Sequence, residues 1–327
     1  MSKLTNRHDI LLLFEVTNGN PNGDPDAGNM PRRDPNTERG IVTDVCLKRK
    51  IRNFVELYVA PEQPEERPEN TNGFNILIKQ GAVIESEQKP GEDAAKATVK
   101  KDQLPKGKSL EDAQAEEAIK WLCRKFYDLR TFGGVVSTGN GVLKGSAFGQ
   151  VRGPVQFTFG QSVDPIAPME VSITRCAVTK EADKNKERTM GNKYIVPYAL
   201  YVAKIYVSPV FAEKTGFSDE DLEVFFKALE WMFSPDPSAA RAEMAVRGIY
   251  DFEHIGTHAD AIDEVQKRQN LKEAKLGCAH AHKLFEGIKI ALKQGKERPS
   301  SFADYDVVNT WTEENLPKGV KLHVRGV

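Results

Sequence analysis

Three aspartates near the N-terminus have the chemistry of a metal site. Asp24, Asp26 and Asp34 lie in a segment rich in glycine, proline and asparagine, and carboxylate oxygens suit the Mg²⁺ used in phosphodiester hydrolysis. The Asp-Pro steps at 24–25 and 34–35 also favour turns, so the same residues can simply bend the chain. The sequence leaves both alternatives open: a metal-dependent nuclease, and a turn, which is the more common use of such residues.

Histidine and cysteine give weaker indications of a site. His254 and His258 are four residues apart but lack the glutamate of a zinc-protease helix. Cys278, His280 and His282 are close in sequence, yet the four cysteines of the chain form no C-x-x-C pair. No Ser/His/Asp or Cys/His set has motif context either. We therefore expect satisfied structural histidines, no metal, no cofactor and a reducing, cytoplasmic location.

A glycine-dense loop covers residues 131–153 and contains seven glycines. Glycine lets a backbone approach a ligand closely, so phosphate binding has to be considered. Residues 134–141 match the glycine spacing of a P-loop but lack its Lys-Ser/Thr pair, which excludes that class of nucleotide hydrolase. Two alternatives stay open: a structural loop, and a cradle for an RNA backbone with Lys144 and Arg152 as its cations.

A basic helix follows the acidic turn. Thr43 and Asp44 form a predicted N-cap. The predicted buried stripe comprises Leu47, Ile51, Phe54, Val55 and Tyr58, and the cations on the opposite face are Lys48, Arg49 and Arg52. Such cations usually face solvent without further function. The preceding loop adds Arg32, Arg33 and Arg39, so loop, helix N-terminus and side chains together could follow one phosphate path.

The charge of the chain is segregated along its 327 residues. The formal net charge is only -1, which argues against a protein that coats nucleic acid through bulk positive charge. Residues 32–52 nevertheless hold seven basic and three acidic side chains, whereas residues 61–94 hold eight acidic and three basic ones. The most apolar stretch, 194–207, is too short to span a bilayer, so we expect no membrane segment.

The long elements predict an α+β fold. Strands are expected at 10–17, 154–159, 171–178, 194–207 and 248–254, and helices begin at Thr43, Ser109 and Ser218. Residues 74–79 could form a strand, 80–108 appear irregular, and 261–293 appear largely helical. The order of strand, helix, loop, strands, helix and strand matches the βαββαβ ferredoxin-like plan of RNA-recognition folds, as a single domain over 1–327.

Several segments resemble the repeating backbone subunit of subtype I-C CRISPR Cascade effector complexes, the Cas-seven group. The matching segments occur in the expected order and are 14–32, 40–52, 130–134, 149–156, 162–166, 189–191 and 281–286. The run 140–148 is longer than in that family. The resemblance implies an RNA-recognition-motif-like palm, a finger insertion at 60–108 and a thumb hairpin at 179–193.

The resemblance also implies a function. Copies would stack head to tail along one CRISPR RNA and present its bases to a target DNA strand, beside guide-processing and large Cascade subunits. The role would be structural rather than enzymatic, with a metal-dependent RNase on the acidic turn and a small-molecule or nucleotide-binding enzyme as the rival hypotheses. Lys48 and Arg52 would grip guide phosphates, and Met190 would wedge between bases at the thumb tip. The remaining candidate RNA-binding residues are Arg32, Arg33, Arg39, Arg49, Lys144, Arg152, Lys186, Arg188 and Lys193.

Overall fold

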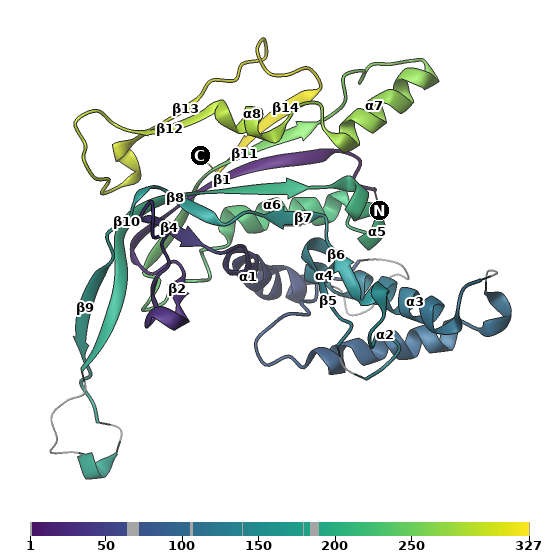
Figure 1. Cartoon of the computed structure of the whole chain (residues 1–327), viewed down its shortest axis with the longest axis horizontal. Helices are drawn as coiled ribbons and strands as arrows, with labels where there is room; N and C mark the ends of the chain where they lie inside the picture. The colour runs from purple at the N-terminus through teal and green to yellow at the C-terminus, as the bar shows by residue number, and fades with distance from the viewer. Residues whose placement is uncertain are drawn as a thin grey trace.

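One antiparallel sheet forms the body of the molecule (Figure 1). The computed structural model describes residues 2–63, 72–104, 107–138, 140–178, 180–183 and 190–326. Its eight-stranded sheet has the order β14-β11-β1-β10-β8-β4, with β7 and β9 also paired to β10. These strands are β1 Arg7–Gly19, β4 Arg39–Val42, β7 Val155–Phe157, β8 Gly160–Pro165, β9 Met169–Thr174, β10 Met190–Val207, β11 Glu243–His254 and β14 Val320–Arg325.

The central strand β1 explains the apolar run at the start of the chain. It pairs with β10 on one side and β11 on the other, and every residue from 8 to 16 is buried. Ile10, Leu12 and Phe14 point to one face of the sheet, and Leu11 and Leu13 point to the other. A strand buried on both faces loses the polar and apolar alternation of a surface strand.

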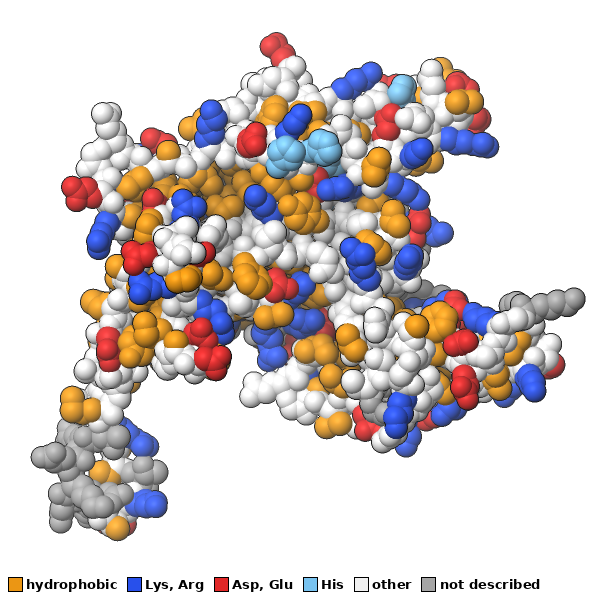
Figure 2. Space-filling view, viewed as in Figure 1, with side chains coloured by type: hydrophobic (Ala, Val, Ile, Leu, Met, Phe, Trp, Pro, Cys, Tyr) orange, Lys and Arg blue, Asp and Glu red, His pale blue; other side chains and the backbone are white. Residues whose placement is uncertain are grey.

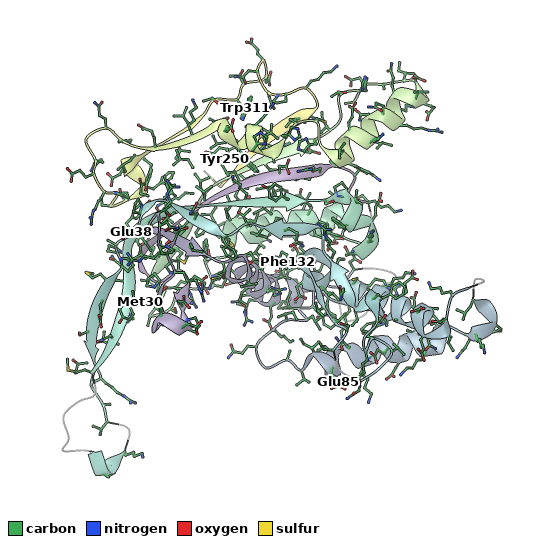
Figure 3. All side chains as sticks on the ribbon, viewed as in Figure 1. Met30, Glu38, Glu85, Phe132, Tyr250 and Trp311 are labelled. Atoms are coloured by element: carbon green, nitrogen blue, oxygen red, sulfur yellow. The ribbon has the colours of Figure 1, made fainter. Side chains whose placement is uncertain are left out.

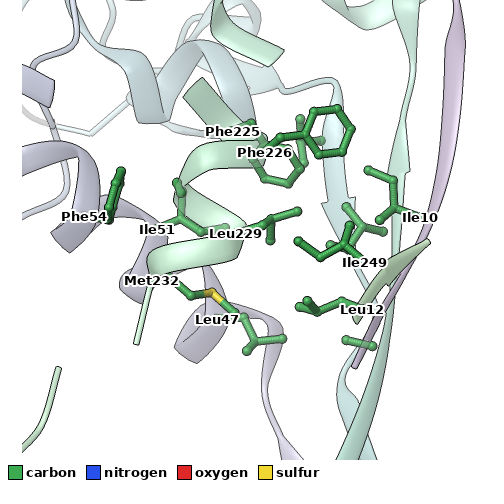
Figure 4. Packing of buried hydrophobic residues seen from close by; sticks show 14 of the residues in the cluster. Ile10, Leu12, Leu47, Ile51, Phe54, Phe225, Phe226, Leu229, Met232 and Ile249 are labelled. Atoms are coloured by element: carbon green, nitrogen blue, oxygen red, sulfur yellow. The ribbon is translucent and has the colours of Figure 1, made fainter. Parts of the chain in front are cut away.

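Two helices cover the first face of the sheet, α1 Asp44–Phe54 and α6 Asp219–Trp231. Their side chains interleave with those of β1 and β11 (Figure 4). The predicted helix starts are confirmed: the Thr43 hydroxyl accepts from the Cys46 N–H, and Ser218 forms a reciprocal capping box with Asp221. Tyr58 departs from the predicted stripe and is 50% exposed, because residues 55–59 form a π-turn that shifts the helical phase.

The C-terminal part of the chain covers the second face. It contributes α7 Glu264–Leu276, α8 Ala281–Glu286, β12 Ile288–Leu292 and β13 Tyr305–Asn309. Leu284 and Phe285 of α8 pack on Leu11 and Phe252 of the sheet. The expectation of helix through residue 293 is wrong at its end, because residues 288–292 pair with β13 as a short antiparallel ladder.

A helical lobe projects beside the body, built from α2 Ile84–Thr98 and α3 Leu110–Lys125. This corrects the expectation that residues 80–108 are irregular with little core, and 74–79 form no strand beyond a single bridge from Asn75 to Phe126. Small residues let the two helices approach closely: a Cβ on Gly91 would lie 2.7 Å from the Trp121 ring. The predicted helix to Arg130 breaks at Phe126 and continues as α4 Tyr127–Phe132.

Shorter elements complete the fold. The remaining strands and helices are β2 Gly23–Asp24, β3 Met30–Pro31, β5 Gly133–Val135, β6 Gln150–Arg152, α5 Pro209–Thr215, η1 Pro25–Ala27, η2 Val55–Val59, η3 Ala60–Glu62, η4 Lys101–Gln103, η5 Ala147–Gly149, η6 Glu181–Asp183 and η7 Phe302–Asp304. The stem of a hairpin, made by β9 and the first part of β10, extends away from the body. Among the described residues, no helix is both long and apolar enough to cross a membrane.

Candidate nucleic-acid interface

A buried arginine fixes α4, the element beside the candidate interface. Arg130 of α4 donates from Nε and Nη2 to the two carboxylate oxygens of Asp221, at 3.0 and 2.6 Å. It also donates to the carbonyls of Cys123 at 2.6 Å and Gly73 at 2.9 Å. Both charged side chains are fully buried. Since these hydrogen bonds end on three different segments, they fix α4 between α6, α3 and the chain before the lobe.

Two of the predicted RNA-binding cations meet at the end of α4. The Lys48 ammonium lies 5.8 Å and the Arg52 guanidinium 5.1 Å from the centre of the Phe132 ring, which Figure 3 labels between α1 and the lobe. Both side chains are largely buried, and each pairs with a carboxylate, Lys48 with Asp44 at 3.1 Å and Arg52 with Asp128 at 2.8 Å. The two cations do share one face of α1, but neither is a free surface charge.

A shallow groove of about 450 Å³ runs along the β5–β6 hairpin beside Phe132. Arg152 lines this groove, is exposed, and stacks its guanidinium 4.2 Å from the Phe211 ring. Gln156 connects the groove to α1: its amide donates to the carbonyls of Phe132 and Gly153, and its oxygen accepts from Lys48. The groove therefore offers an exposed cation, peptide groups and a link to the α1 cations.

The glycines of this hairpin serve close packing. Gly133 has φ of +76°, and a Cβ there would lie 2.2 Å from the Val151 carbonyl oxygen. A Cβ on Gly153 would lie 2.3 Å from the Gly133 nitrogen, so the two glycine backbones are in contact. At these two positions the glycines permit a tight, fixed crossing of the chain, which fits the alternative of a structural loop there.

The arginine-bearing segment is tied to the start of α1. The Asn22 side-chain oxygen accepts from both the backbone N–H and the hydroxyl of Thr43, at 2.9 Å each. Arg32 pairs with Asp24 and Arg33 with Glu38, both at 3.4 Å. Arg39 is exposed and has no ion pair in the part of the chain that the structure describes. The bend places Arg32 and Arg33 beside β4, the strand that leads into the helix, because the Ile41 N–H donates to the Arg32 carbonyl at 2.8 Å and Arg33 bridges to Gly40.

The acidic residues of this segment have local roles. The Asp24 carboxylate accepts from the Asp26 N–H as the cap of η1, and Asp34 accepts from the N–H groups of Asn36 and Thr37 at 2.8 and 3.0 Å. These backbone hydrogen bonds lower the pKa of Asp34. Across the described ranges, no three His, Cys, Asp or Glu side chains gather as a metal site.

Three of the histidines singled out in the sequence have distinct surroundings in the structure. His254 is a buried structural residue: its Nε2 lies 3.0 Å from Asp9, and its Nδ1 accepts from the Cys278 N–H at 2.9 Å. His280 and His282 are exposed, with their rings stacked 5.7 Å apart.

The other predicted residues lie apart from Phe132. Arg49 donates to Asn53 on the outer face of α1, and Lys144 is exposed on the loop before η5, with its ammonium 3.5 Å from Asn140. Met190 is 68% exposed at the outer end of the hairpin stem, and Lys193 is half-buried in the same stem. Lys186 and Arg188 lie outside the described residues.

The sequence did not identify three residues that contact Lys48 or Arg52, namely Phe132, Asp128 and Gln156. An aromatic side chain directly before the Gly133-Gly134 pair is the one local signal. Asp128 and Gln156 lie 76 and 108 residues from their cationic partners, so only the fold brings them together.

Comparison with known proteins gives a family. The model of the family described as CRISPR-associated protein Cas7 matches residues 6–310. A curated protein of that description from Haloferax volcanii is 27% identical over 234 residues, which cover 67% of this chain and 61% of the relative. The chain thus spans about three fifths of the length of that relative.

Solved structures similar to this chain include two titled as CRISPR RNA-guided surveillance complexes. One, in a pre-nicking state, has a TM-score of 0.47 at 18% identity and covers 75% of each chain. The other has a TM-score of 0.41 at 13% identity and covers 82% of this chain and 81% of that one. A type III-B Cmr-beta complex bound to cognate target RNA has a TM-score of 0.38 at 10% identity and covers 75% of this chain and 60% of that one. Because the family model spans nearly the whole sequence, the chain belongs to the family of CRISPR-associated protein Cas7.

Proposed function

We propose that this protein is the repeating, non-catalytic backbone subunit of a type I-C Cascade surveillance complex. Copies polymerise head to tail along a CRISPR RNA in the cytoplasm and present its bases for pairing with a target DNA strand, beside guide-processing and large subunits. Guide sequences vary, so such a subunit has to bind phosphate and sugar without reading bases.

The observation that carries the proposal is the concentration of cations on a member of the Cas7 family. Lys48 and Arg52 flank Phe132, Arg152 lines the adjoining groove, and Arg39 is exposed at the start of β4, the strand that leads into α1. The peptide groups of the glycine hairpin border the same groove. This combination suits a sugar-phosphate backbone, which needs positive charge and close approach.

The sheet supports a ferredoxin-like palm. Its strands β11-β1-β10-β7 are adjacent in that order, with α1 between β1 and β7 in the chain and α6 between β10 and β11. This is the arrangement of the βαββαβ plan. The C-terminal segment covers much of the face that RNA-recognition motifs use for stacked bases, so we place the guide at the periphery.

The insertions fit fingers and a thumb. The lobe of α2 and α3 extends the proposed fingers beyond 60–108, because the core of that region is shared with α3. The hairpin that contains 179–193 is the proposed thumb, and Met190 exposes its side chain on the described part of the stem. An exposed, unbranched apolar side chain can insert between unstacked bases.

The test of RNA binding uses exposed cations, which can be changed without breaking buried ion pairs. Reversing Lys48 and Arg52 would place glutamates beside Asp44 and the buried Asp128, so the fold itself would suffer. The double variant Arg39→Glu with Arg152→Glu avoids this problem.

We expect that double variant to bind single-stranded RNA at least about tenfold more weakly, with the salt slope reduced by about 1.4 for two lost phosphate contacts. The matched control reverses two exposed lysines of the C-terminal segment, Lys289 and Lys318, and should bind as the wild type does. Equal RNA affinity for both variants would contradict the proposed interface.

The rival hypothesis of a metal-dependent RNase is tested separately. Guide-bound protein is incubated with complementary RNA and Mg²⁺, and the products are resolved by denaturing electrophoresis. Cleavage that Asp24→Ala or Asp34→Ala abolishes would overturn the non-catalytic assignment. Because both carboxylates already accept local backbone hydrogen bonds, we expect the RNA to remain intact with the wild type and with both variants.

A further inference from the structure

The two α1 cations are held by carboxylates with different surroundings. Lys48 and Arg52 lie one turn apart against Phe132, and each has one carboxylate partner. The Asp128 side chain is fully buried, whereas the Asp44 side chain is 26% exposed. This difference decides which pair a phosphate can open, because solvent-exposed pairs are weak and screened while a buried carboxylate cannot be left unpaired.

Both carboxylate oxygens of Asp128 accept hydrogen bonds. Its Oδ1 accepts from the Leu77 N–H at 2.8 Å, and its Oδ2 accepts from the Ile78 N–H at 3.0 Å and from Nε of Arg52 at 2.8 Å. Three donors hold the carboxylate, and the carboxylate in turn holds the guanidinium beside Phe132. Nη1 and Nη2 of Arg52 have no hydrogen bond within the described residues, so these are the atoms left for a ligand.

Within the ranges that the structure describes, the Asp44 side chain has a single side-chain partner, the Lys48 ammonium. Lys48 has a second partner, because Gln156 Oε1 lies 3.3 Å from the ammonium. Gln156 is itself fixed by the Phe132 carbonyl at 3.1 Å and the Gly153 carbonyl at 3.0 Å. An incoming anion can therefore replace Asp44 while Gln156 keeps Lys48 in position.

We propose that Asp44 is a competing carboxylate that a backbone phosphate of single-stranded RNA displaces from Lys48, whereas Asp128 is a positioning residue that holds Arg52 both with and without RNA. Asp44 thus lowers the affinity for RNA and Asp128 raises it. This inference rests on the proposed function, since it requires a backbone phosphate at α1. A chain of linked phosphates overcomes the competition more easily than one free phosphate does, because contacts elsewhere on the subunit hold it in place.

The experiment compares Asp44→Asn and Asp128→Asn by fluorescence anisotropy with a labelled single-stranded oligouridylate across a salt series. We expect Asp44→Asn to bind about threefold more tightly than the wild type at low salt, with the difference closing as salt screens the pair. We expect Asp128→Asn to bind about tenfold more weakly, since a charge-assisted hydrogen bond is lost. Its salt slope should fall by about 0.7, the equivalent of one phosphate contact.

Asp219 provides the matched control. It follows the Ser218 cap of α6 as Asp44 follows the Thr43 cap of α1, so Asp219→Asn removes the same charge from the same helical position. That variant should bind as the wild type does. Circular dichroism of each variant verifies folding, and Asp44→Asn carries the test if Asp128→Asn does not fold.

The outcomes distinguish the roles of Asp44 and Asp128 from RNA binding itself. Affinity that is unchanged or weakened in Asp44→Asn, or raised equally in Asp219→Asn, overturns the competing role while RNA binding by the wild type stands. A wild-type salt slope in folded Asp128→Asn overturns the positioning role. Absence of RNA binding by the wild-type protein overturns the proposed function itself.

Discussion

Replacement of Arg130 by methionine tests the buried network that fixes α4. Methionine fills a similar volume but removes the two hydrogen bonds to Asp221 and those to the carbonyls of Cys123 and Gly73. The Asp221 carboxylate, fully buried, is then left without its cation. A buried charge that has lost its partner strongly destabilises the folded state.

The expected loss is about 3 kcal/mol in the free energy of unfolding, at the lower end for breaking a buried pair. The lower end applies because Asp221 keeps three other donors, the N–H and hydroxyl of Ser218 and the side-chain amide of Asn72. For a chain of 327 residues this loss corresponds to a fall in Tm of about 4 °C.

Urea unfolding followed by circular dichroism measures the effect, in a double-mutant cycle with Asp221→Asn. The control Lys267→Met removes an exposed pair with Glu264 and should cost no more than about 0.5 kcal/mol. A cost below about 1 kcal/mol for Arg130→Met, or a coupling energy near zero in the cycle, would refute the reasoning.

Two further predictions concern pH and the glycine hairpin. Burial alone would lower the pKa of His8, but the Asp251 carboxylate at 3.0 Å, together with Glu253 and Asp9, raises that pKa above the usual 6.5. The stability this pair contributes is full below pH 6.5 and is lost as pH rises through the folded pKa. The urea midpoint of the wild type should therefore fall between pH 6 and 9, and that of His8→Gln should change less over this range. The same pH dependence of the midpoint in both proteins would contradict the pairing. Gly133→Ala should cost about 3 kcal/mol through a positive φ and the contact with the Val151 carbonyl, whereas Gly145→Ala, with φ of +67° and open space, should cost about 1 kcal/mol. Equal unfolding free energies for the two alanine variants would show that the crossing is not tight.

The fold was predictable where local chemistry decides it. The Thr43 cap, the Ser218 capping box and the buried β1 run could be identified from neighbouring residues alone. The helix at 84–98 was missed because its buried side includes Gln88, Gly91, Glu92 and Ala95, which carry little hydrophobic periodicity. Its stability comes from the facing helix, which a local pattern does not contain.

The site was predictable in its cations but not in their partners. Lys48 and Arg52 follow from helical spacing, yet burial and pairing depend on Asp128 and Gln156, which belong to other elements. The alternative in which these cations simply face solvent is wrong for Lys48 and Arg52, because both are largely buried in ion pairs. The RNA-binding roles of these residues stay predictions for the binding experiments.

The long strand β10 has a mechanical consequence for the hairpin. Its 18 residues run without a break, and it changes partner from β9 at Ile195 to β1 at Val196. The outer part of β10, Met190–Ile195, therefore extends about 20 Å from the sheet and is held at one end by the core of the sheet. A tilt of about 5° at the start of this segment displaces Met190 by about 1.7 Å, which is about half the rise between stacked bases in a duplex. For the proposed contact of Met190 with an RNA strand, the position of the side chain is thus set by packing in the hydrophobic core of the sheet.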